Sequence, residues 1–364
     1  MNITRNSISF ENGLDLESGE RLGNLRIQFE TYGELNEDRS NAILICHHLA
    51  SNCQVAGKIE GESAVNGWWD PAVGPGKVFN TDDFFVICSD VLGGWGGSTG
   101  PSSIDPETGK SYAASFPVVT IRDMVNTQKR LIDHLGITQL LCVVGASFGG
   151  FQALDWSVAF PGAVKRVITF AASSKCTTFN IALFSTMRNA IMSDPSWNGG
   201  NYYDRPDKGS CVRTAAALSV LFRLTPQIFE ERFGRTRTRT DANKFSLRSE
   251  FLVEEYLNQI SDNAAQYMDP NSILFLTKAQ DYFDMSEGHE RLTDAFRDSQ
   301  SEYLFINYEN DLRNSKAEID LVVQAINDAG REVDSMIIKH KSGPASFLWD
   351  IATYWDVVRD LLRK

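Results

Sequence analysis

A serine flanked by glycines is the strongest chemical signal in this sequence. Residues 145–149 read Gly-Ala-Ser-Phe-Gly, a G-x-S-x-G pattern centred on Ser147. A short apolar run that begins at Leu140 precedes the pattern, and a helical pattern that extends to Trp156 follows it. This order of strand, G-x-S-x-G and helix is typical of a nucleophile elbow, a strained turn that exposes the serine hydroxyl above a sheet. The pattern predicts that Ser147 is a nucleophile; the alternative is a tight turn without chemistry.

A serine nucleophile also requires an oxyanion site, an acid and a base. The N–H of Phe148 lies at the start of the predicted helix, where it would face a developing oxyanion. In this architecture the acid follows a late strand and the base follows the last one. Asp311 comes directly after the strand-like residues 301–309, so we predict it as the acid. His340 ends the last strand-like run, 333–340, and is the candidate base.

The elements that must position these residues alternate between strands and helices. Residues 2–10 and 24–33 alternate apolar and polar side chains and predict two antiparallel strands. Buried strands are predicted at 41–48, 83–90, 140–145 and 164–173, with an amphipathic helix at 120–135. Such alternation predicts an α/β fold with parallel strands. Helical patterns dominate the stretch 177–290, so we predict a core of residues 1–176 and 291–364 with an inserted helical lid at 177–290.

Composition argues against several classes of partner. The formal net charge of -12 and the pI near 5.0 argue against binding to nucleic acid or to an anionic membrane. No apolar run approaches the ~18 residues of a membrane span, and the first residues lack the apolar segment of a secretory signal. The six cysteines form no C-x-x-C pair. We therefore expect a cytoplasmic, reduced, metal-free protein that acts on a small molecule.

Over almost its whole length the sequence resembles the homoserine O-acetyltransferases, a family with the α/β-hydrolase fold. The stretches that carry the resemblance are HHLASNCQVAG, NGWWDPAVGPGK, FFVICSDVLGGWGGSTGPSSIDPETGKSY, FPVVTIRDMVNTQKRLIDHLGI and GASFGGFQALDW in the core, and IMSDPSWNGGNYY, FEERFGR and SILFLTKAQDYFDM in the lid. The resemblance implies an α/β-hydrolase core with a mostly parallel sheet. It also implies a ping-pong reaction in which acetyl-CoA, or another acyl-CoA, acylates the serine and a hydroxyl amino acid accepts the acyl group. The resemblance implies no bound cofactor. It does imply a homodimer that forms through the lid.

The resemblance assigns roles to four residues. Ser147 matches the nucleophile and Asp311 matches the triad acid. Leu49 matches the residue whose N–H forms the oxyanion hole together with that of Phe148.

The departures from the family pattern affect the base and the acceptor pocket. Where the family has a G-H-D-A-F type sequence with its general-base histidine, residues 343–347 read Gly-Pro-Ala-Ser-Phe, so Pro344 takes the base position and Ala345 that of the following acid. Proline cannot accept a proton. The lid positions at which the family carries an Arg and, seven residues on, a Tyr hold Ala216 and Arg223. We expect homoserine to be a poor acceptor, with Arg223 as a partial substitute in substrate binding.

Three functions stay open on the sequence alone. The favoured one is an O-acyltransferase that works through a Ser147 acyl-enzyme with a displaced or substrate-supplied base. The alternatives are a catalytically impaired or repurposed protein of this fold, and a hydrolase of small esters. His340 lies four residues, or about 13 Å of strand, before the base position, which favours the absence of a protein base over a role for His340. His47 and His48, beside the oxyanion loop, are interpreted as positioning residues.

Overall fold

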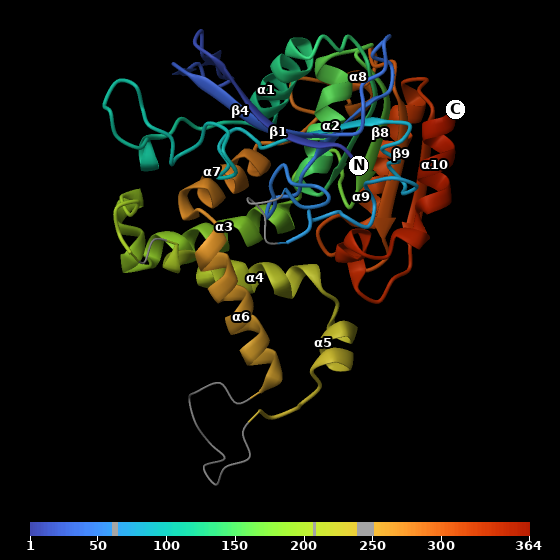
Figure 1. The fold of residues 1–364 in the computed structure, drawn as a ribbon. Coiled ribbons are helices and arrows are strands. Elements are labelled where there is room, and N and C mark those ends of the chain that lie inside the picture. The colour runs from blue at the N-terminus through green and yellow to red at the C-terminus, as the bar shows by residue number, and fades with distance from the viewer. Residues whose placement is uncertain (60–64, 207–208, 239–250) are drawn as a thin grey trace.

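An eight-stranded sheet forms the centre of the molecule, with strand order β1-β4-β6-β5-β7-β8-β9-β10 (Figure 1). The computed structural model describes residues 1–59, 65–206, 209–238 and 251–364. The strands are β1 (Ile3–Phe10), β4 (Leu25–Tyr32), β5 (Ala42–Cys46), β6 (Phe85–Ser89), β7 (Leu140–Ala146), β8 (Val164–Phe170), β9 (Glu302–Tyr308) and β10 (Val333–Ile338). From β6 to β10 neighbouring strands run parallel, whereas β1 pairs antiparallel with β4, and β4 with β6. The predicted α/β fold with a mostly parallel sheet is confirmed.

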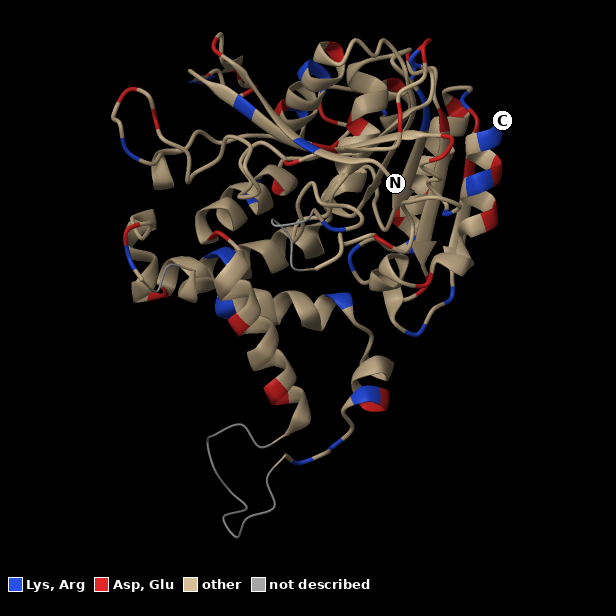
Figure 2. Cartoon of the chain, in the orientation of Figure 1, with Lys and Arg blue, Asp and Glu red and all other residues tan. Residues whose placement is uncertain are grey.

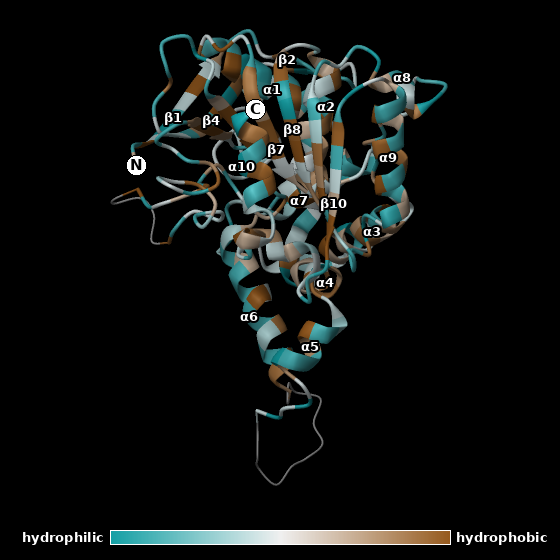
Figure 3. Ribbon diagram, turned by 90° about the vertical axis from the view of Figure 1, so that its right-hand side faces the viewer, coloured by the Kyte–Doolittle hydropathy of each residue, from teal (hydrophilic) through white to brown (hydrophobic). Residues whose placement is uncertain are grey.

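The central strands are continuous apolar runs because helices and loops cover both faces of the sheet. Every residue of β5 is buried, and Figure 3 shows hydrophobic residues concentrated in the central strands. One face packs against α1 (Ile121–His134), α2 (Phe148–Ala159) and α9 (Lys316–Asp328). The other face packs against α10 (Trp355–Arg363) and the loop around Trp69. Charged residues lie mostly on outer helix surfaces and loops (Figure 2).

Helix α2, which follows Ser147, is anchored on α1 by polar contacts. The guanidinium of Arg122 donates from Nε and Nη2 to the two carboxylate oxygens of Asp155, at 2.7 and 2.8 Å. Deeper in the interface, the Gln128 side chain donates to Gln152 and accepts from the Trp156 indole, both at 2.7 Å. These contacts satisfy polar groups that would be costly to bury alone, and they fix the helix that begins directly after the candidate nucleophile.

Between β8 and β9 the described chain forms helices that project from one end of the sheet (Figure 1). They are α3 (Thr178–Ser193), α4 (Arg213–Arg223), α5 (Pro226–Arg232), α6 (Leu252–Tyr267) and α7 (Pro270–Asp281), with the 3-10 turns η2 (Pro195–Gly200) and η3 (Ser210–Val212). The segment leaves and rejoins the core at adjacent points: Cys176 N–H donates to Phe283 O at 2.8 Å, and Met285 N–H to Ser174 O at 2.9 Å. The boundaries predicted for core and lid stay a prediction.

The remaining elements are short. They are the β2 (Leu14–Asp15) and β3 (Arg21–Leu22) hairpin, η1 (Ala113–Ser115), α8 (Leu292–Ala295), η4 (Gly343–Leu348) and η5 (Ile351–Thr353). All six cysteines are buried free thiols. Within the described ranges, no helix is long and apolar enough to cross a membrane.

Candidate active site

Ser147 joins β7 to α2 in a backbone conformation that non-glycine residues seldom adopt, with φ 52° and ψ -116°. The two flanking glycines make this turn possible. A Cβ at Gly145 would lie 2.1 Å from Gly149 O, and a Cβ at Gly149 would lie 2.0 Å from Cys46 O. The G-x-S-x-G spacing therefore follows from the close approach of α2 to β7 and to the end of β5.

The residues predicted for the oxyanion hole lie beside this turn. Leu49 follows β5, the strand that pairs with β7, and it lines the same cavity as Ser147. Phe148 is the first residue of α2 and its side chain is buried. Within the described chain no group accepts a hydrogen bond from the backbone N–H of Leu49 or Phe148. Both donors are thus available to an oxyanion.

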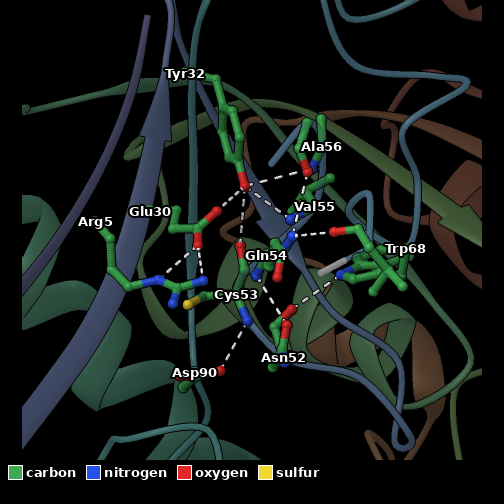
Figure 4. Close-up of polar contacts among 12 residues, drawn as sticks. Arg5, Glu30, Tyr32, Asn52, Cys53, Gln54, Val55, Ala56, Trp68 and Asp90 are labelled. Atoms are coloured by element: carbon green, nitrogen blue, oxygen red, sulfur yellow. Dashed lines mark hydrogen bonds and ion pairs between the residues drawn. The ribbon is translucent and has the colours of Figure 1, made fainter. Parts of the chain in front are cut away.

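A buried polar network holds the loop that carries Leu49 (Figure 4). The Tyr32 hydroxyl donates to the Glu30 carboxylate and accepts from Val55 N–H at 2.8 Å. The Asp90 carboxylate accepts from Cys53 N–H at 2.7 Å, and burial raises its pKa to about 6. Because these partners come from β4 and from the residue after β6, the loop is tied to two strands of the sheet.

The cavity beside Ser147 lies between the core and the helices that follow β8. Core residues, α3, α4 and η4 all contribute to its wall: His48, Leu49, Ala50, Ser147, Ala171, Leu183, Phe184, Met187, Ser219, Phe222, Arg223, Arg313, Pro344, Ala345, Phe347 and Leu348. The lining is mostly apolar, so it suits an acyl chain or another small hydrocarbon group. Ser147 is the hydroxyl side chain in this cavity wall whose backbone has a positive φ.

Asp311 follows β9 as predicted, and its side chain is fully buried. One carboxylate oxygen accepts from Arg313 N–H at 2.9 Å and the other from the Asn314 amide at 3.0 Å. Among the described residues no histidine contacts this carboxylate. Pro344 and Ala345 instead form part of the cavity wall. An acid is therefore in place without an imidazole to orient.

His340 is engaged elsewhere. It lies two residues beyond the end of β10, its Nε2 is 3.1 Å from Asp350 Oδ2, and its Nδ1 accepts from Ser342 N–H at 3.1 Å. It is not among the residues that line the Ser147 cavity. The structure brings Ser147 and Leu49 to one cavity and leaves His340 outside it.

His48 is the histidine that lines this cavity together with Ser147. Its ring packs edge-on against Trp68 at 5.0 Å and Phe347 at 6.2 Å between ring centroids. Burial and the positive charges of His47, Arg223 and Arg313 lower its pKa to about 3. The neighbouring His47 points inward: its Nδ1 donates to His48 O at 2.9 Å and its Nε2 accepts from Val91 N–H at 3.3 Å. His48 is thus a neutral imidazole at neutral pH.

Arg313 is a cavity residue that the sequence reasoning missed. The available signal was its position, two residues after the predicted acid in the loop that follows β9. Arg223, predicted as a substrate-binding residue, ends α4 and lines the same cavity. The structure therefore places two guanidinium groups in the cavity of the candidate nucleophile.

Comparisons with known proteins agree with this geometry. Residues 41–312 match the family model described as alpha/beta hydrolase fold. A homoserine O-acetyltransferase from Geobacter sulfurreducens is 40% identical over 362 residues, covering 100% of this chain and 98% of that protein. A crystal structure of homoserine O-acetyltransferase from Bacillus anthracis superposes with a TM-score of 0.92 at 28% identity, covering 100% of this chain and 98% of that one. The structure of esterase E22 has a TM-score of 0.90 at 28% identity, covering 99% and 100%. The sheet, the family model and these relatives together show that the chain belongs to the homoserine O-acetyltransferase family of the α/β-hydrolase fold.

Proposed function

We propose that this protein is an O-acyltransferase that takes an acyl group from acyl-CoA onto Ser147 and passes it to a hydroxyl acceptor other than homoserine. The observation that carries the proposal is the strained backbone of Ser147 beside an apolar cavity and two unpaired N–H groups. Holding a serine at positive φ costs about 1–3 kcal/mol. A turn without chemistry has no need of that strain, because a glycine would relieve it.

In the first half of the reaction, Ser147 Oγ attacks the thioester carbonyl carbon. The carbonyl oxygen becomes an oxyanion that accepts hydrogen bonds from Leu49 and Phe148 N–H. The carbon–sulfur bond then breaks, and CoA leaves as a thiolate that takes up the proton lost by the serine. A thiol is far more acidic than an alcohol, so this leaving group needs little help from an acid.

In the second half, the acceptor hydroxyl attacks the acyl-serine through a similar tetrahedral intermediate. The new ester forms, the Ser147 ester bond breaks, and the acceptor's proton returns to Ser147 Oγ. Since Asp311 has no imidazole to orient, each deprotonation is slow compared with that of a complete triad. The family resemblance, the nucleophile and the oxyanion donors support transfer, and the missing base limits its rate.

Specific observations favour each of the two alternative functions. Pro344 and Ala345 in the cavity wall favour a catalytically impaired or repurposed protein. The similarity to esterase E22 favours hydrolysis of small esters, in which water takes the place of the acceptor.

A homodimer through the lid is also proposed. Large apolar side chains exposed on α3, α4 and α6 support it: Phe179, Ile181, Leu221 and Tyr267. A cytoplasmic location is likewise a proposal from composition.

Mixing the protein with acetyl-CoA should add one acetyl group to Ser147. Intact-mass spectrometry over a time course would detect the adduct, and peptide mapping would place it. The Ser147→Ala variant is the control and should stay unmodified, because it lacks the attacking hydroxyl. An unmodified wild-type protein, tested with short and longer acyl-CoA donors, would favour the impaired alternative. Acylation that decays in buffer without an acceptor would favour the hydrolase.

Homoserine should be a poor acceptor. A carboxylate moved out of water needs a charged partner in a matching position. Ala216 offers only a methyl group at the lid position where the family carries an arginine, and the guanidinium groups of the cavity, Arg223 and Arg313, come from other positions. We expect turnover with acetyl-CoA and homoserine to stay below the ~1–10³ s⁻¹ usual for enzymes, as measured by release of free CoA thiol. The Ala216→Arg variant should lower KM for homoserine. Wild-type turnover within the usual range would contradict this expectation.

A further inference from the structure

The cavity beside Ser147 is positively charged. Arg223 and Arg313 both line it, and Arg223 also lines an adjoining cavity between α4 and α6. None of the described residues that line either cavity is Asp or Glu. Ala216 lines only the adjoining cavity and lies seven residues before Arg223, about two helical turns away. One guanidinium from the lid, Arg223, and one from the core, Arg313, therefore line the cavity of the nucleophile.

The guanidinium groups of Arg223 and Arg313 have too few anionic partners within the described chain. Arg313 forms an ion pair with Asp311, with 3.6 Å between Arg313 Nε and Asp311 Oδ1, but this buried Nε makes no hydrogen bond. The Arg223 side chain makes no hydrogen bond or ion pair with any described residue. Burial lowers its pKa, the nearby Tyr256 hydroxyl opposes that shift, and the charge of Arg313 adds to it. A largely buried cation without an anionic partner is unfavourable. Such an arrangement is typical of a site that is completed by a ligand.

We infer that Arg223 and Arg313 bind the carboxylate of a small organic acid that carries no ammonium group. The planar guanidinium matches the two oxygens of a carboxylate. Leu183, Phe184 and Met187 offer apolar surface to the hydrocarbon part of such a ligand. The ammonium of an amino acid would meet two like charges and no lining carboxylate. The inference rests on the proposed function and deepens it: the acceptor is a hydroxy acid rather than a hydroxyl amino acid.

The state of His48 agrees with this assignment. The charges of Arg223 and Arg313 contribute to its low pKa, and all three side chains line the cavity that contains Ser147. A carboxylate bound there offsets those charges and makes the neighbouring imidazole more basic.

Equilibrium binding tests the inference without any acyl donor. Calorimetry on the full-length wild-type protein would compare 4-hydroxybutanoate with L-homoserine, which differ only in the amino group, and with 1-butanol and inorganic phosphate. We expect 4-hydroxybutanoate to bind at least tenfold more tightly than each of the other three. Equal affinity for homoserine, or for phosphate, would overturn the assignment to an ammonium-free organic acid.

Variants locate the site. Arg223→Met should weaken binding of 4-hydroxybutanoate at least tenfold and should raise Tm without ligand, because it removes a cation that has no partner. Arg213→Met is the matched control on the same helix: its side chain is half exposed and paired with Asp262, and the variant should bind as the wild type does. Unchanged affinity in Arg223→Met, or a lower Tm, would overturn the inference.

Failure of this inference is distinguishable from failure of the proposed function. An acyl adduct on Ser147 without carboxylate binding rejects only the organic-acid site. Carboxylate binding without an adduct rejects the acyltransferase and leaves a binding protein for organic acids.

Discussion

Replacing Pro344 by histidine should accelerate the acylation of Ser147 by acetyl-CoA by about 10²-fold or more, the range in which a positioned general base contributes. Pro344 lines the cavity that contains Ser147, and the buried Asp311 carboxylate already follows β9. A neutral imidazole at position 344 would take the serine proton, with Asp311 available to orient the ring. The acylation rate of the variant should rise with pH as the new imidazole loses its proton, because only the neutral ring accepts another.

The measurement is the rate of adduct formation by mass spectrometry or by release of CoA thiol. Pro344→Ala separates the loss of the proline ring from the gain of an imidazole, and it should acylate at nearly the wild-type rate. His340→Ala should also leave the rate nearly unchanged, because His340 contacts Asp350 and Ser342 rather than the cavity. Equal acceleration in Pro344→Ala would contradict the account, and so would a loss of two or more powers of ten in His340→Ala.

Gly149→Ala should lower the free energy of unfolding by about 2–3 kcal/mol and greatly slow the acylation of Ser147. The added Cβ would lie 2.0 Å from Cys46 O and 2.9 Å from His47 O, both backbone atoms. Overpacking typically costs about 1–3 kcal/mol or more, which outweighs the roughly 1 kcal/mol that alanine gains over glycine within a helix. The displaced first turn of α2 would carry Phe148 N–H away from the oxyanion.

Denaturant unfolding and adduct formation measure the two effects. Gly23→Ala is the matched control, since its Cβ would meet Pro106 Cγ at 3.5 Å, an ordinary contact, and Gly23 likewise has no positive φ. That variant should match the wild type in both assays. If Gly149→Ala also matched the wild type, the close packing of α2 against the end of β5 would have no energetic consequence.

The sequence predicted the elements of this fold better than the contacts between them. Local patterns sufficed for the strand-to-helix turn at Ser147 and for the central strands. A fully buried strand is a continuous apolar run, and the G-x-S-x-G spacing reflects backbone contacts over a few residues. The antiparallel pair at 2–10 and 24–33 was also predicted and is confirmed by the pairing of β1 with β4.

The charges around the nucleophile could not be predicted in the same way. His48, Arg223 and Arg313 come from three segments that meet only in the folded chain. The pairing of His340 with Asp350 depends on how the chain turns through η4. Strand periodicity placed His340 at the end of a strand, yet β10 ends at Ile338 and the side chain binds within the following turn.

The inserted helical segment leaves and rejoins the core at a backbone contact. This contact affects how proteins with this fold can diversify. Lys175 and Asp284 form an antiparallel bridge, while β8 and β9 pair with each other from Arg166 to Phe170 without help from the intervening chain. An insert whose ends already lie together can be lengthened, shortened or exchanged at small entropic cost, since doubling a loop adds only about 0.6 kcal/mol. The inserted helices form one wall of the cavity, whereas the strand-borne serine belongs to the other. The contribution of the inserted helices to ligand preference can therefore change over evolutionary time without a change in the geometry of the nucleophile.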